Sequence, residues 1–180
     1  MTRFVALLRG INVGGHRPLE MGALRDLIGG LGHTRVGSHL QTGNIAFSSD
    51  LTDTAAMAAR IQAAVQTELS VDAKVLVMSR DDLVTIIESN PLPDAVEMPS
   101  RLHVAFLWAQ PSVEQVTALN PAMYMPDQLR MGRGAAYVFY PNGAAKSRLT
   151  NDALERKLGV TSTMRNWNTV NALADLARDF

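Results

Sequence analysis

The spacing of apolar residues at the start of the chain predicts a strand followed by a helix. Residues 4–8 are a continuous apolar run, FVALL, which is typical of a central strand buried on both faces. After a glycine-rich loop, Pro18 suits the first turn of a helix. The glycines at 29, 30 and 32 end that helix. Its apolar face, at spacings of three and four, consists of Leu24, Leu27, Ile28 and Leu31.

Alternating residues then predict two strands, at 35–41 and 45–47, joined by a tight turn at Thr42-Gly43. Thr52 or Asp53 has the side chain to cap the next helix. The apolar face of that helix consists of Met57, Ile61, Val65 and Leu69.

A fourth strand at 71–78 and a short helix complete this first set of elements. Ser79 and Asp82 have capping-box spacing for the helix. The order is therefore βαββαβ with an extra helix. Three prolines between residues 90 and 100 then predict an exposed connector.

The same order of elements begins again after residue 100. The pattern predicts a strand at 102–108 and then a helix capped by Ser112 and Gln115, with Val113, Val116 and Leu119 on its apolar face. A hairpin of strands 128–131 and 136–140 follows, and then a helix that runs from 147 or 150 to 158 and is ended by Gly159. A strand at 161–165 leads to a last helix, whose apolar face consists of Val170, Leu173, Ala174 and Ala177. We therefore predict a tandem duplication: a first unit at 1–90, a connector at 91–100 and a second unit at 101–180.

The predicted fold class is α+β, a tandem pair of ferredoxin-like βαββαβ units with extra helices. Such a unit has strand order 4-1-3-2. The loop after its first strand and the turn between its second and third strands share one edge of the sheet. In the first unit, this topology brings two polar groups of residues together: Arg9, Asn12, Gly14 and Gly15 from the loop, and Gln41, Gly43 and Asn44 from the turn.

Composition and charge narrow the class of protein. The 180 residues carry 17 basic and 17 acidic side chains, divided 8 and 9 before residue 91 and 9 and 8 after it. This balance argues against long nucleic acid as the main partner. The absence of cysteine excludes disulfides and thiolate sites and fits a cytoplasmic protein. No apolar run approaches the ~20 residues of a membrane span, and no secretory signal is recognised.

Three motifs occur in order along the chain: LLRGINVGG, QTGNI and TMRNWNTV. Together they resemble a bacterial family known only as a domain of unknown function, number 1697 in that series, and the resemblance covers the whole chain. It implies a tandem ferredoxin-like α+β fold and no activity. The matching positions are Arg9, Gly10, Asn12, Gly14, Gly15, Gln41, Gly43, Asn44, Thr163, Arg165, Asn166, Trp167, Asn168 and Thr169.

The glycine-rich loop has two interpretations. Its backbone N–H groups suit an anion at the start of the helix that follows, but the glycines also suit a tight joint between strand and helix. The loop is neither a Walker loop nor a dinucleotide fingerprint, because the required spacings are missing. Arg9 would bind a phosphate or carboxylate, or else tie loop carbonyls together. Gln41 and Asn44 are ligand-binding candidates or turn residues.

The last motif mixes structural and ligand-binding candidates. We expect Trp167 to be buried and either Asn166 or Asn168 to cap the final helix. Arg165 and the other asparagine would then form an anion seat. They join the Arg9 site only if the two units pack in opposed directions, which we predict.

No metal, cofactor or catalytic residue is assigned from the sequence. Its histidines have no metal-ligand spacing, and no G-x-S-x-G motif occurs. The leading interpretation is therefore a protein that binds a small anionic metabolite or nucleotide. The alternatives are an enzyme of unknown reaction at the same cluster, or a protein or RNA interaction module. Candidates for base stacking in such a module, although burial is favoured for most, are Trp108, Tyr137, Phe139 and Tyr140. The oligomeric state is left open.

Overall fold

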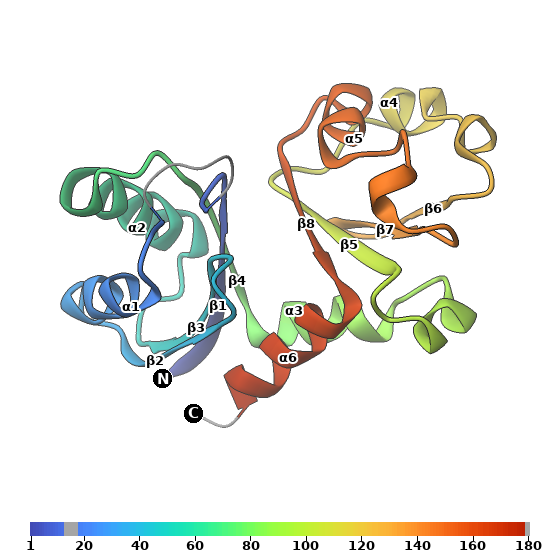
Figure 1. Ribbon diagram of the computed structural model, residues 1–180. Coiled ribbons are helices and arrows are strands. Elements are labelled where there is room, and N and C mark those ends of the chain that lie inside the picture. The colour runs from blue at the N-terminus through green and yellow to red at the C-terminus, as the bar shows by residue number, and fades with distance from the viewer. Residues whose placement is uncertain (13–17, 179–180) are drawn as a thin grey trace. The chain divides into compact units, whose positions relative to one another are not determined.

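The structure is a computed structural model that describes residues 1–12 and 18–178 (Figure 1). The chain divides into two compact units, Met1–Val84 with Ala172–Phe180, and Thr85–Asn171. Each unit contains a four-stranded antiparallel sheet. Within the described residues, no helix combines the length and apolar character needed to cross a membrane.

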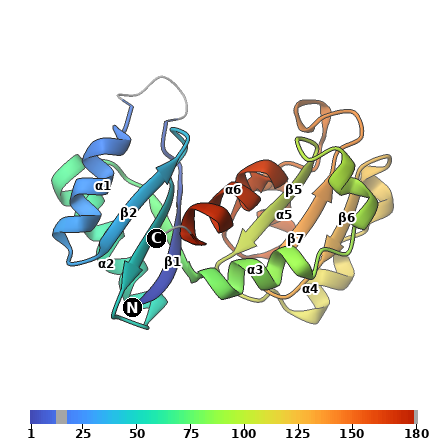
Figure 2. The same ribbon diagram turned by 90° about the horizontal axis from the view of Figure 1, so that it is seen from below.

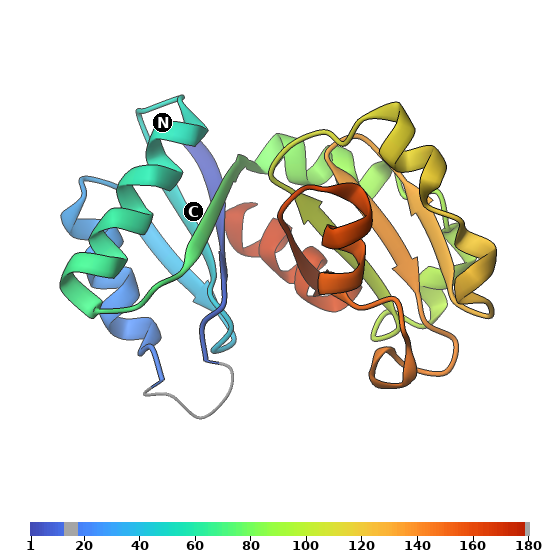
Figure 3. The ribbon, with the colours of Figure 1, turned by 90° about the horizontal axis from the view of Figure 1, so that it is seen from above.

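The first unit has the predicted βαββαβ order. Its elements are β1 (Thr2–Arg9), α1 (Met21–Gly30), β2 (Thr34–His39), β3 (Asn44–Ser49), α2 (Thr54–Leu69) and β4 (Lys74–Ser79), followed by α3 (Arg80–Glu88). The sheet order β2-β3-β1-β4 confirms the predicted 4-1-3-2 arrangement. Both α1 and α2 lie on one face of this sheet (Figures 2 and 3).

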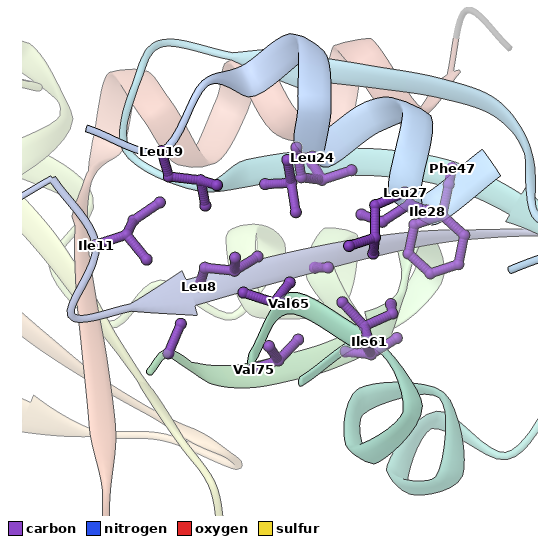
Figure 4. Packing of buried hydrophobic residues seen from close by; sticks show 14 of the residues in the cluster. Leu8, Ile11, Leu19, Leu24, Leu27, Ile28, Phe47, Ile61, Val65 and Val75 are labelled. Atoms are coloured by element: carbon purple, nitrogen blue, oxygen red, sulfur yellow. The ribbon is translucent and has the colours of Figure 1, made fainter. Parts of the chain in front are cut away.

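The core of the first unit lies between the sheet and these two helices. Figure 4 shows Leu24, Leu27 and Ile28 of α1 and Ile61 and Val65 of α2 packed together around β1. Residues 4–8 of β1 are buried throughout, so the continuous apolar run does mark a strand covered on both faces. All residues of the predicted helical faces are buried or half-buried in this core.

The second unit repeats the plan. Its elements are η1 (Pro93–Glu97), β5 (Leu102–Leu107), α4 (Val113–Ala118), η2 (Pro121–Tyr124), β6 (Gln128–Met131), β7 (Ala135–Phe139), η3 (Ala144–Lys146), α5 (Asn151–Leu158), β8 (Ser162–Asn166) and α6 (Trp167–Arg178). The sheet order is β6-β7-β5-β8, again 4-1-3-2, and α4 and α5 lie on one face (Figure 1). The tandem α+β fold is therefore confirmed.

Several helix ends form where the sequence predicts them. Gly159 ends α5 in the left-handed conformation, with φ of 65°. The predicted capping residues Asp53, Ser79 and Ser112 each accept a backbone N–H three residues on. Thr150, one of the two predicted starts of its helix, does the same. Ser112 and Gln115 form the complete capping box. These interactions are local, which is why spacing alone predicts them.

Three local predictions were wrong. Helix α1 begins at Met21 rather than near Pro18, because Asn12 accepts the Leu19 backbone N–H outside the helix. Val113 is 78% exposed, since α4 has only six residues and Val113 is its first. The segment between residues 90 and 100 is not an exposed connector throughout. It contains η1, and its Leu92 and Ala95 are buried.

The division into units falls within α3 and α6. The last residues of α6 belong with the first unit, where the Ala174 carbonyl accepts a hydrogen bond from Arg80 at 3.3 Å and the Arg178 carbonyl accepts one from Arg3 at 2.6 Å. The domain bounds 1–90, 91–100 and 101–180 stay a prediction.

His33 lies buried between α1 and β2, with 4% of its surface exposed. Its Nδ1 is 3.1 Å from the Ser49 hydroxyl, and its ring lies 4.7 Å from the Phe47 ring. Its Nε2 has no hydrogen-bond partner among the described residues. Burial, and then the positive charge of Arg60, lower the pKa of His33. The folded protein therefore favours the neutral imidazole.

This lowered pKa predicts a pH-dependent stability. The unfolded chain takes up a proton at His33 near pH ~6.5 while the folded chain resists it, so the free energy of unfolding falls as the pH drops below that value. His33→Asn should reduce the loss of stability between pH ~7 and pH ~5.5, measured by urea unfolding. Burial also lowers the pKa of His103, so part of the loss remains in the variant. An unchanged pH dependence would contradict this role.

Candidate functional site

Three connections meet at one edge of the first sheet. Because β1 is antiparallel to both β3 and β4, its end lies beside the start of each neighbour: Leu7 pairs with Asn44, and Arg9 pairs with Lys74. The loop after β1, the β2–β3 turn and the loop before β4 therefore converge. We name the first two, residues 9–12 and 40–44, the loop–turn edge.

The side chain of Asn12 joins the two parts of this edge. Its amide donates to the Gln41 carbonyl at 2.5 Å and to the Leu19 carbonyl at 3.3 Å, and its oxygen accepts the Leu19 N–H at 2.6 Å. Asn12 adopts a left-handed backbone conformation, with φ of 55°, which asparagine tolerates better than most residues. The predicted proximity of loop and turn is confirmed. The Asn12 amide already donates its hydrogen bonds to backbone groups of the fold.

Gly43 brings the turn into close contact with β1. Its carbonyl accepts the Leu8 N–H at 2.9 Å, and its φ is 72°. A Cβ atom at this position would lie 2.7 Å from both Leu8 Cβ and Ile11 Cδ1, closer than real atoms approach. Glycine is therefore required here by backbone conformation and by space.

Asn44 also has a structural role. It is fully buried, and its amide donates to the His39 carbonyl at 3.1 Å and to the Thr42 hydroxyl at 2.7 Å. Both bonds close the turn from inside, so this side chain is not presented to a ligand. Gln41 differs, because its side chain is exposed and only its backbone carbonyl takes part in the Asn12 contact.

The second unit repeats this joint with different residues. The Leu107 N–H donates to the Gly134 carbonyl at 3.0 Å, as Leu8 does to Gly43. Gly134 has a φ of 70°, and its N–H donates to the Gln110 side chain at 3.3 Å. Both units thus have a turn glycine and a loop amide side chain at this place, although Asn12 donates to a carbonyl and Gln110 accepts an N–H.

Cationic side chains remain at the first unit's edge. Arg9 is half-buried and Lys74 is exposed, and the two lie directly opposite each other on β1 and β4. The alternating residues Leu8 and Val75 face the helices, so Arg9 and Lys74 point to the other face of the sheet. The sequence pattern did not single out Lys74. Its position follows from strand register, which sequence spacing does not reveal.

The other predicted loop residues, Gly14 and Gly15, lie outside the described residues, as does His16. In the described part of the chain, no group of three or more histidine, aspartate or glutamate side chains has the arrangement of a metal site.

The motif near the end of the chain caps α6. Asn166 accepts the Thr169 N–H at 3.0 Å. Trp167 is buried, and its backbone N–H donates to the Pro99 carbonyl at 3.2 Å. Both structural predictions are confirmed. Asn168 is exposed in the first turn of α6.

Arg165 is held by its own strand. Its guanidinium donates to the Thr163 hydroxyl and to the Met164 carbonyl, each at 2.9 Å. Burial lowers the pKa of Arg165 to about 10, so the side chain is still a cation at neutral pH. The anion seat at Arg165, and a single site shared with Arg9, stay predictions.

Comparison with known families identifies the chain. The family model described as "Protein of unknown function (DUF1697)" matches residues 1–137. The chain belongs to this family. The loop–turn edge of this DUF1697 protein lies within the matched part, while the TMRNWNTV motif lies beyond it.

Other comparisons concern the fold. No curated protein matches this DUF1697 chain. The solved structure of the conserved bacterial protein SP0830 from Streptococcus pneumoniae is similar to it, with a TM-score of 0.70, 23% sequence identity and coverage of 98% of each chain. This likeness shows that the two proteins share a fold.

The Asn12 contacts predict a stability effect in this DUF1697 protein. Asn12→Ala removes the partner of the Leu19 N–H and of the Gln41 carbonyl, and should lower the free energy of unfolding by ~1–3 kcal/mol. Urea unfolding measures this change. Gln41→Ala is the matched control. It removes an exposed side chain and keeps the carbonyl, so a change within ~0.5 kcal/mol is expected. Equal effects of the two substitutions would contradict the proposed role of Asn12.

Proposed function

We propose that this protein binds a small anionic ligand, a metabolite or nucleotide carrying a phosphate or carboxylate, at the edge formed by Arg9, Lys74 and Gln41. The observation that carries the proposal is the direct pairing of Arg9 with Lys74 across β1 and β4. Like charges at opposed positions destabilise a sheet, and an anion between them relieves this repulsion.

The chemistry of the two cations is complementary. Arginine offers a planar fork that binds two oxygens of a phosphate or carboxylate, whereas lysine acts as a compact point charge. Neither Arg9 nor Lys74 is without partners inside the chain, so a ligand adds to existing contacts. The exposed Gln41 side chain, carried on the turn that Asn12 fixes, would supply a neutral donor and acceptor at the same edge.

The structural roles of Asn12, Gly43 and Asn44 reduce the number of residues that we expect to contact the ligand. Their side chains or backbone serve the joint between loop and turn, so we propose that they position the site without touching the ligand. This division favours the two cations as the groups that give affinity. It assigns no catalytic residue, and an enzymatic reaction at the same cluster stays the alternative.

The RNA-module alternative loses support from burial. Tyr137, Phe139 and Tyr140 are all buried, so these rings are not exposed to stack on bases. Trp108 is half-buried.

Thermal unfolding in the presence of inorganic phosphate and carboxylic acids tests the proposal. A ligand that binds the folded state stabilises it by ~2.7 kcal/mol at one hundred times its Kd. For a chain of this length, that corresponds to a rise of about 5–10 °C in Tm. Arg9→Ala and Lys74→Gln should each abolish most of this rise while the protein stays folded.

Arg133→Gln serves as the matched control, because it removes one exposed arginine from the other unit. It should leave the rise in Tm intact. If Arg9→Ala unfolds the protein, Arg9 is structural and Lys74→Gln decides the question. A rise that survives both substitutions would place the site elsewhere.

A further inference from the structure

A cavity of about 360 Å³ opens in the second unit. Two segments line it, residues 124–127 before β6 and residues 142–148 after β7. Since β6 and β7 are antiparallel, both segments lie at the sheet edge opposite the Gly134 turn. The volume falls within the ~300–1,000 Å³ range of small-molecule sites. No motif of the sequence pointed to this place.

Side-chain hydrogen bonds fasten the two segments together. The Ser147 hydroxyl donates to the Asp127 carboxylate at 2.5 Å and accepts the Leu149 N–H at 2.8 Å. The Arg148 guanidinium donates to the Met123 carbonyl at 3.0 Å. The cavity walls are thus held by contacts between them, so the space exists before a ligand enters.

The charged groups at the cavity favour an anion. Lys146 and Arg148 both line it, against a single carboxylate, Asp127, which already accepts the Ser147 hydroxyl. Among the residues that the structure describes, the Lys146 ammonium has neither an ion pair nor a hydrogen bond. A guanidinium has five N–H donors, so Arg148 keeps donors beyond the one given to Met123.

Part of the remaining wall is apolar and exposed, and Asn142 and Gly143 complete the lining. Tyr124, Met125 and Pro126 line the cavity beside the cations. Met125 is 76% exposed and Met123, next to the cavity, is 61% exposed. Large apolar side chains with this exposure suggest a surface that is covered in a complex. Thioethers adapt their shape and contact aromatic rings favourably.

We propose that this cavity is a second ligand site, which binds a phosphate monoester carrying an aromatic or heteroaromatic body. Lys146 and Arg148 bind the phosphate, and Tyr124 and Met125 cover the body. The site lies wholly within the second unit, so it is independent of the edge formed by Arg9 and Lys74. Neither the phosphate nor the aromatic body is expected to bind well by itself.

Methyl NMR of the full chain with methionine-labelled protein tests this proposal at the site. The Met125 signal is assigned by its loss in Met125→Leu. Three probes are titrated: adenosine monophosphate, adenosine and inorganic phosphate. Adenosine monophosphate should shift the Met125 signal and bind at least about tenfold more tightly than either part, the change expected when one charged hydrogen-bonded group is lost.

Substitutions separate this site from any other. Lys146→Gln should weaken the adenosine monophosphate response of Met125 by about tenfold, and Arg148→Lys tests the need for the planar fork at constant charge. Lys157→Gln, an exposed lysine on α5, is the matched control and should change nothing. Arg9→Ala should leave the Met125 response intact, whether or not the first edge binds an anion.

Several results would overturn the proposal. An unmoved Met125 signal at saturating adenosine monophosphate excludes the site. Equal affinity for inorganic phosphate excludes a role for the body, and equal affinity for adenosine excludes a role for the phosphate. A Met125 response that is unchanged in Lys146→Gln excludes the assigned cation.

Discussion

The hydrogen bonds of the Asn12 side chain fix the geometry on which the first unit's polar edge depends. One amide spans the loop after β1, the start of the chain leading to α1 and the β2–β3 turn, through Gln41 and Leu19. A shorter side chain would not reach, and an apolar one would leave a backbone donor and acceptor unpaired. Gly43 of the same turn lies close to Leu8 and Ile11.

These hydrogen bonds distinguish residues that hold the loop and turn in place from residues that are candidates for ligand binding. Polar side chains at a loop suggest a ligand site, yet the side-chain amides of Asn12 and Asn44 donate hydrogen bonds to backbone carbonyls and to a neighbouring hydroxyl. The cations are proposed to have a different role, because like charges that lie opposite each other, as Arg9 and Lys74 do, repel and do not by themselves stabilise a sheet. The candidate for ligand binding is therefore the charge pair, and the amides hold its surroundings in place.

The second unit has the same backbone contact between its first strand and its turn, but its cavity lies at the other edge of the sheet. Leu107 and Gly134 repeat the backbone contact of Leu8 and Gly43. The cavity beside Lys146 and Arg148, however, lies at the opposite sheet edge, where Ser147 and Asp127 join two irregular segments. The two units share the topology and the turn glycine, while the cationic groups proposed to bind ligands lie at different edges of the two sheets.

The sequence by itself determined the element order, the helix caps and both sheet topologies, because these follow from local spacing and from the few ways a βαββαβ unit folds. It also placed the loop after β1 beside the turn at Gly43, and it predicted that Trp167 is buried and that either Asn166 or Asn168 caps the last helix. Only the tertiary structure decided which polar side chains form hydrogen bonds within the fold. The partners of Asn12 lie at Gln41 and Leu19, and hydrogen bonding between distant segments has no signature in spacing. The pairing of Arg9 with Lys74 required strand register, and the cavity at Lys146 required the packing of two irregular segments. A local pattern specifies neither.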